Sequence, residues 1–98
     1  MLYVIGTSEF DFVAIKSNTL ASVDDNGNMH IEPFIIGVEC DIPNSRATFF
    51  NNLSDAVGVL ENLKKKGSAV KFESFIGEPV PTIKDLHIYQ LSASVVNL

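Results

Sequence analysis

The segment 51–67, NNLSDAVGVLENLKKKG, has the pattern of an α-helix, and the arrangement expected for the rest of the chain depends on it. Its apolar residues recur at steps of three and four, as on one face of a helix with 3.6 residues per turn. They are Leu53, Ala56, Val57, Leu60 and Leu63. Such a stripe has to be buried against other elements, and the strand-like segments on both sides can supply that surface.

The two ends of this segment carry the residues that helix ends favour. Asn51 or Asn52 can act as N-cap, and Asp55 places a negative charge in the first turn. Three lysines at 64–66 oppose the negative end of the helix dipole, and Gly67 follows where a positive φ is inexpensive. The sequence therefore predicts one helix over about residues 52–66.

Short segments rich in β-branched and aromatic residues surround the helix. They predict five to seven short strands, at about 2–6, 10–16, 19–23, 29–41, 46–50, 69–76 and 86–91. Most are separated by short polar turns, such as Ser17-Asn18 between the second and third. Tight turns favour antiparallel pairing. We therefore expect a single α+β domain over residues 1–98, an antiparallel sheet with the helix packed on one face.

Two sequence features concern the third and fourth predicted strands: the turn between them and a proline within the fourth. Between them, Asn26-Gly27 in DDNGN suits a type I′ hairpin turn, since both residues accept a positive φ. Asp24, Asn26 and Asn28 are also spaced like ligands of a calcium loop, but Gly27 comes too early and Ile35 stands where glutamate is needed. The hairpin interpretation is preferred. Pro33 lacks a backbone donor, so we expect its strand to be at an edge, bulged or split there.

The net charge of −5 and pI near 4.7 disfavour nucleic-acid binding, which depends on lysine and arginine neutralising phosphates. No apolar run approaches the ~20 residues needed to cross a bilayer, so no membrane association is expected. The first residues carry no basic segment ahead of an apolar one, which favours a cytoplasmic protein over a secreted one.

Candidate chemical residues are few, and none forms a recognised motif. His30 and Glu32 alternate on one strand and could hold a metal with Glu39 or Asp41. Separately, Asp85, His87 and Tyr89 could form an acid–base row. In both places the preferred interpretation is a half-exposed strand, so no cofactor, metal or catalytic residue is predicted. The lone Cys40 lies between two acids, which disfavours a reactive thiolate.

Two parts of the chain resemble small uncharacterised proteins of phages and prophages of low-GC Gram-positive bacteria. One is the opening 2–5 segment, LYVI; the other is ATFF at 47–50, followed by the capped helix with Ala56 in its first turn. The resemblance covers about a third of the chain. It implies an origin and no active site.

The leading hypothesis is a non-enzymatic protein-interaction module, a phage or prophage accessory protein that self-associates. Val95, Val96 and Leu98 near the end of the sequence need cover, and they predict an interaction surface that could form a homodimer. An enzyme or metal-binding protein using His30 and His87 is the first alternative, and it needs both histidines in one pocket. A structural component of a virion or larger assembly is the second.

Overall fold

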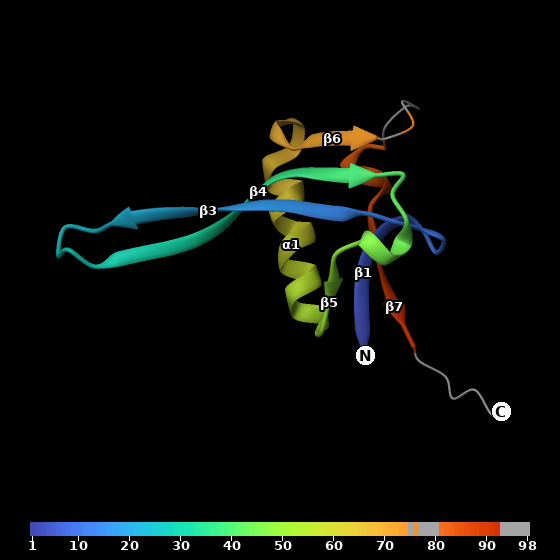
Figure 1. Cartoon of the computed structure of the whole chain (residues 1–98), viewed down its shortest axis with the longest axis horizontal. Coiled ribbons are helices and arrows are strands. Elements are labelled where there is room, and N and C mark those ends of the chain that lie inside the picture. The colour runs from blue at the N-terminus through green and yellow to red at the C-terminus, as the bar shows by residue number, and fades with distance from the viewer. Residues whose placement is uncertain (75, 77–80, 93–98) are drawn as a thin grey trace.

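The computed structural model describes residues 1–74, 76 and 81–92 (Figure 1). In this part of the chain it contains one α-helix and seven strands, which confirms the α+β class. The strands are β1 (Leu2–Ser8), β2 (Asp11–Phe12), β3 (Ala14–Val23), β4 (Met29–Cys40), β5 (Phe49–Phe50), β6 (Lys71–Ser74) and β7 (His87–Leu91). Three single turns of 3₁₀-helix, at Asn44–Arg46, Gly67–Ala69 and Ile83–Asp85, connect them.

The helix α1 (Leu53–Lys66) begins and ends close to the predicted positions. The side chain of Asn52, and not of Asn51, caps it by accepting a hydrogen bond from the Asp55 amide at 2.9 Å. At the other end Gly67 has φ = 53°. Of the predicted stripe, Ala56, Leu60 and Leu63 are buried, whereas Leu53 is exposed because it lies in the first turn, at the margin of the core.

The strands form two hydrogen-bonded sheets instead of the one that the sequence suggests. In the first, β7 runs antiparallel to β1 from Leu2↔Leu91 to Gly6↔His87. The other edge of β1 is shared, since β5 pairs with Tyr3 and Val4 while β2 pairs further along the strand. All pairings in this sheet are antiparallel, as expected.

The second sheet has the order β3-β4-β6 and includes one parallel pair. The β3–β4 hairpin is antiparallel, but β6 runs parallel to β4 from Gly37↔Lys71 to Cys40↔Ser74. The expectation of an antiparallel sheet fails at this pair because α1 lies between β4 and β6 in the chain, and a helical crossover lets two strands run in the same direction. A Cβ at Gly37 would come within 2.9 Å of the Lys71 carbonyl oxygen, so a larger residue there would crowd this pair.

The second and third predicted strands have different boundaries in the structure. The chain leaves the first sheet at Val13, whose amide donates to the Ile5 carbonyl at 2.9 Å, and β3 then continues to Val23 without interruption. No turn forms at Ser17-Asn18, because both residues pair with β4 in the ladder, opposite Ile35 and Phe34. Pairing with a long partner strand has outweighed the local turn preference.

The predictions for the fourth strand are confirmed in part. β4 passes through Pro33 unbroken, with a register shift nearby, between Lys16 and Ser17 of its partner. Pro33 is accommodated because β6 pairs with β4 only from Gly37 onward, so the other edge of β4 is unpaired at the proline within the described chain. The turn at 24–28 is present, but of its residues only Gly27 has a positive φ, so it is not type I′.

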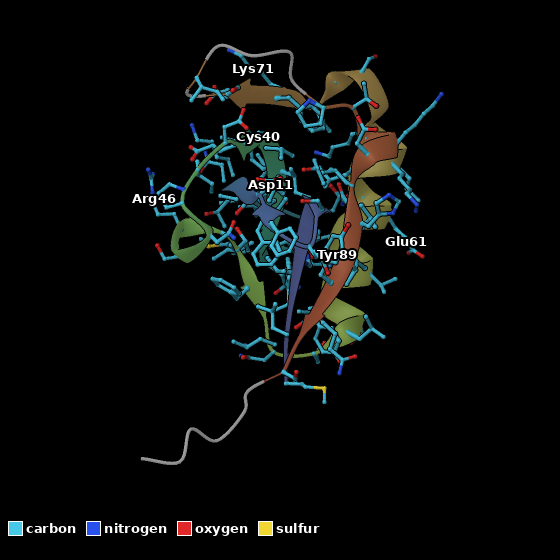
Figure 2. All side chains as sticks on the ribbon, turned by 90° about the vertical axis from the view of Figure 1, so that its right-hand side faces the viewer. Asp11, Cys40, Arg46, Glu61, Lys71 and Tyr89 are labelled. Carbon is cyan, nitrogen blue, oxygen red and sulfur yellow. The ribbon has the colours of Figure 1, made fainter. Side chains whose placement is uncertain are left out.

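The main core lies between α1 and both sheets. Its buried members are Ile5, Val13, Val38, Cys40, Leu60, Leu63, Val70 and Leu86. A smaller cluster of Val4, Phe12 and Ala47 packs near Tyr89 (Figure 2). Because Ile5 and Val38 come from different sheets and Leu63 from the helix, burial of these apolar side chains joins the three layers.

Candidate functional site

The most unusual feature of the structure is the outer part of the β3–β4 hairpin, residues 17–35, which we call the arm. Figure 1 shows it projecting well beyond α1 and the remaining strands. No third strand pairs with it among the described residues, because β6 reaches only Gly37–Cys40 of β4. A two-stranded hairpin in water is marginally stable by itself. The arm is therefore an element whose exposed surface calls for a functional explanation.

The ladder register divides the side chains of the arm between two faces. Residues directly opposite each other in an antiparallel pair share a face. The last pair is Val23↔Met29, and Ala21↔Ile31 lies two residues further in on the same face. Between them, Ser22↔His30 belongs to the opposite face. One face of the outer arm is thus apolar on both strands.

These apolar side chains are largely uncovered. Val23, Met29 and Ile31 are 66%, 67% and 63% exposed, which is unusual for a cluster of three large aliphatic residues. We call Ala21, Val23, Met29 and Ile31 the tip patch. Leu20, 58% exposed, lies on the other face by the same register.

The loop beyond the tip patch is held in a fixed shape by Asp24. Its carboxylate accepts hydrogen bonds from the amides of Asn26 and Asn28, both at 2.9 Å, and Asp24 Oδ2 lies 2.9 Å from His30 Nε2. The contact with His30 is the main reason that the pKa of Asp24 is lowered, and the backbone hydrogen bonds add to it. Asp25, next to it, is exposed and adds a second acidic group at the tip.

A cleft of about 400 Å³ opens where the base of the arm meets α1 and β5. Its apolar wall is formed by Ile15, Phe34, Ile35, Phe50 and Val59. At one end, the Lys66 ammonium donates to the Ile35 carbonyl at 3.2 Å and lies 5.7 Å from the centre of the Phe34 ring. The cleft therefore combines an apolar wall with the carboxylate of Asp55, and a lysine lies beside it.

A charged row on the second sheet is a structural feature that the sequence did not indicate. Lys16 Nζ lies 2.9 Å from Glu39 and 3.1 Å from Glu73, and so it links all three strands. Arg46 approaches Glu39 at 4.0 Å. The two carboxylates raise the pKa of Lys16, with the hydrogen bond to Glu39 as the largest cause. Glu39 is buried and paired with Lys16, and Glu73 is paired with the same lysine, so both acids of this row already have a partner.

The two histidines are not brought together. His30 lies on the arm, next to its loop, whereas His87 is exposed on β7 of the other sheet, opposite Gly6. In Figure 1 the arm and β7 lie on opposite sides of α1. Neither histidine lines the cleft, and the described residues contain no group of three or more His, Cys, Asp or Glu placed to hold a metal. The side chain of Glu32 lies outside what the structure describes.

Two members of the candidate acid–base row, Asp85 and Tyr89, make structural contacts. Asp85 accepts hydrogen bonds from both the amide and the hydroxyl of Thr82, at 2.8 and 3.3 Å, as part of a capping box. The ring of Tyr89 packs 6.3 Å from that of Phe12. The preferred interpretation of a half-exposed strand agrees with this geometry.

Cys40 is the buried last residue of β4. Burial, and then the charge of Asp41, raise the pKa of its thiol to about 11. Such a thiol is mostly protonated near neutral pH and is a poor nucleophile.

The predicted interaction surface at Val95, Val96 and Leu98 lies outside the described residues. The arm was missed at the sequence level because its residues alternate like those of any half-buried strand. The available signal was that Val23, Met29 and Ile31 closely flank a polar loop.

Comparisons with known proteins give no family model, no curated protein and no solved structure that matches this chain. No helix in the described part of the chain is both long and apolar enough to cross a membrane. The functional argument consequently depends on the geometry of the arm and the cleft.

Proposed function

We propose that this chain is a non-enzymatic protein-interaction module that binds its partner through the apolar face of the arm. The observation that carries this proposal is the tip patch, which exposes three large aliphatic side chains on an element with no covering layer in the described chain. Exposed apolar clusters of this kind on a soluble domain are typical of partner surfaces.

The construction of the arm supports a binding role. Its loop is fixed by hydrogen bonds to Asp24, and its strands pair without interruption from Ser17 to Val23. An ordered apolar surface loses less conformational entropy on binding than a flexible one. The proposed setting is the cytoplasm, in a phage or prophage context, where an accessory protein and a component of a larger assembly would both use such a surface.

A comparison of two surface variants tests this function. Val23→Ser combined with Ile31→Ser removes the tip patch, and Leu20→Ser removes one exposed apolar side chain from the opposite face. We expect tagged wild-type protein and the Leu20→Ser control to retain the same polypeptides, including further copies of the chain, from cells that encode it. The double variant should lose them while keeping its thermal unfolding midpoint.

Two results would contradict the proposal. Equal retention by the double variant would show that the tip patch is not the binding surface. If the wild-type protein retained no polypeptide and did not self-associate in solution, the chain would have no partner under these conditions and the proposed function would be wrong.

A further inference from the structure

We infer that the partner of the arm is a second copy of this chain. In the proposed dimer two arms lie antiparallel with their apolar faces together, so that each tip patch covers the base and cleft of the other arm. This inference rests on the proposed function and specifies its partner. Two observations carry it: the face that the tip patch shares with part of the cleft wall, and the charges at the two ends of the arm.

The tip patch lies on the same face of the arm as Ile15 and Ile35 of the cleft wall. Ile15 and Ser17 line the cleft, and by strand alternation Ala21 and Val23 lie on the same face of β3. From Ser17 to Val23 this face extends about 20 Å at the usual rise per residue. When two equal arms overlap antiparallel around a two-fold axis near their midpoints, the tip of each must lie at the base of the other. The tip patch would then meet the apolar wall at Ile15 and Ile35.

The charges at the two ends of the arm have opposite signs. The loop at the tip carries Asp24 and Asp25, whereas the C-terminal end of α1 places Lys66 beside Phe34 at the base of the arm. Among the described residues, the one acid that lines the cleft is Asp55, which lies at the other end of the helix. Lys65 is seven residues from Gly58, a cleft residue, and so lies on the same stripe of the helix. An antiparallel overlap brings each acidic loop toward the lysines of the other copy. This attraction offsets part of the repulsion between two chains that each carry a net charge of −5.

Charge reversal at these two positions gives a specific test. Asp25 and Lys65 are chosen because both are exposed and neither makes a hydrogen bond or ion pair identified in the structure, so their replacement should not disturb the fold. Sedimentation velocity over a concentration series would measure the dimer dissociation constant of the full-length chain. We expect a dimer for the wild type, and dissociation constants raised about tenfold by Asp25→Lys or by Lys65→Glu, the size of a lost close charge pair.

Combining the variants separates this geometry from a general charge effect. The double variant Asp25→Lys with Lys65→Glu should recover a dissociation constant near that of the wild type. An equimolar mixture of the two single variants should form a heterodimer, because every contact between tip and cleft then pairs opposite charges. Leu20→Ser, on the other face, should leave the dimer unchanged, and Val23→Ser with Ile31→Ser should abolish it.

The contrary outcomes are distinct. A monomer at every concentration overturns the inference, although retention of another protein through the tip patch would leave the proposed function standing. A dimer that survives the tip-patch double variant also overturns it, since the interface would lie elsewhere, for example at Val95 and Val96. A dimer weakened equally by single and double reversals, with no heterodimer in the mixture, shows that tip and cleft do not meet.

Discussion

Val23 and Met29 lie directly opposite each other as the last pair of the β3–β4 ladder, and about two thirds of each residue is exposed. Large aliphatic side chains normally use such cross-strand pairs to cover part of a core. Here nothing in the described chain packs over them. The pair therefore stabilises the arm locally and leaves its apolar surface available to a partner.

The first prediction compares the stability cost of replacing two leucines of the apolar stripe predicted for the helix. Leu63 is fully buried between the helix and the sheets, whereas Leu53 is 49% exposed. Leu63→Ala should lower the free energy of unfolding by about 2–5 kcal/mol, and Leu53→Ala by less than about 1 kcal/mol. Urea unfolding followed by circular dichroism measures both, and equal losses would mean that the helix presents a different face.

The second prediction concerns the start of the helix. The Asn52 side-chain oxygen accepts from the Asp55 amide at 2.9 Å and from the Ser54 hydroxyl at 2.7 Å. Asn52→Ala should therefore cost about 1 kcal/mol in unfolding free energy. Asn51→Ala is the matched control, because its neighbour provides the cap, and it should have little effect. A larger loss of unfolding free energy for Asn51→Ala than for Asn52→Ala would show that Asn51, and not Asn52, caps the helix.

The third prediction is a pH dependence in the loop of the arm. The pKa of Asp24 is held below the ordinary value of an aspartate, chiefly by its hydrogen bond with His30. A carboxylate whose pKa is lower in the folded state stabilises the fold above its unfolded pKa, and this contribution disappears as the pH falls through the folded pKa. Carbon-detected NMR titration should place the Asp24 midpoint below that of an aspartate in an unfolded peptide.

The same titration of two histidine variants identifies the cause. His30→Ala should raise the Asp24 midpoint toward its ordinary value, whereas His87→Ala, on the other sheet, should leave it unchanged. An Asp24 midpoint that does not respond to His30 would mean that the backbone amides alone lower the pKa.

The fourth prediction concerns the reactivity of Cys40. With its thiol buried and its pKa raised to about 11, modification by a soluble disulfide reagent at mildly alkaline pH should be slow. The reduced thiolate fraction alone predicts a rate about 100-fold below that of the unfolded chain in urea. Rapid modification without denaturant would show that β4 opens at its end, or that the thiol is more accessible than its burial indicates.

Local sequence patterns were sufficient to predict the helix and most of the strands, but not which strands pair with each other. Asn52, Gly67 and the leucines between them specify a helix from residues close in sequence, so its ends and buried face could be predicted. Ser17 and Asn18 show the limit, because their turn preference was outweighed by pairing with Ile35 and Phe34, far along the chain. The parallel β4–β6 pair could not be foreseen either, since register between distant strands is set by packing.

The sequence by itself determined the α+β class, the helix and the glycine at its C-terminal end, because each depends on neighbouring residues or on composition. The choice of Asn52 as N-cap and the burial that raises the pKa of Cys40 came only with the tertiary structure. Only the tertiary structure decided which apolar strand residues are buried. Val38 and Val23 occur in similar apolar segments, yet Val38 lies under the helix and Val23 is exposed on the arm. The physical reason is that the body of the fold ends near Ser17, where the covering layer of helix and strands ends and the two strands of the arm continue without it.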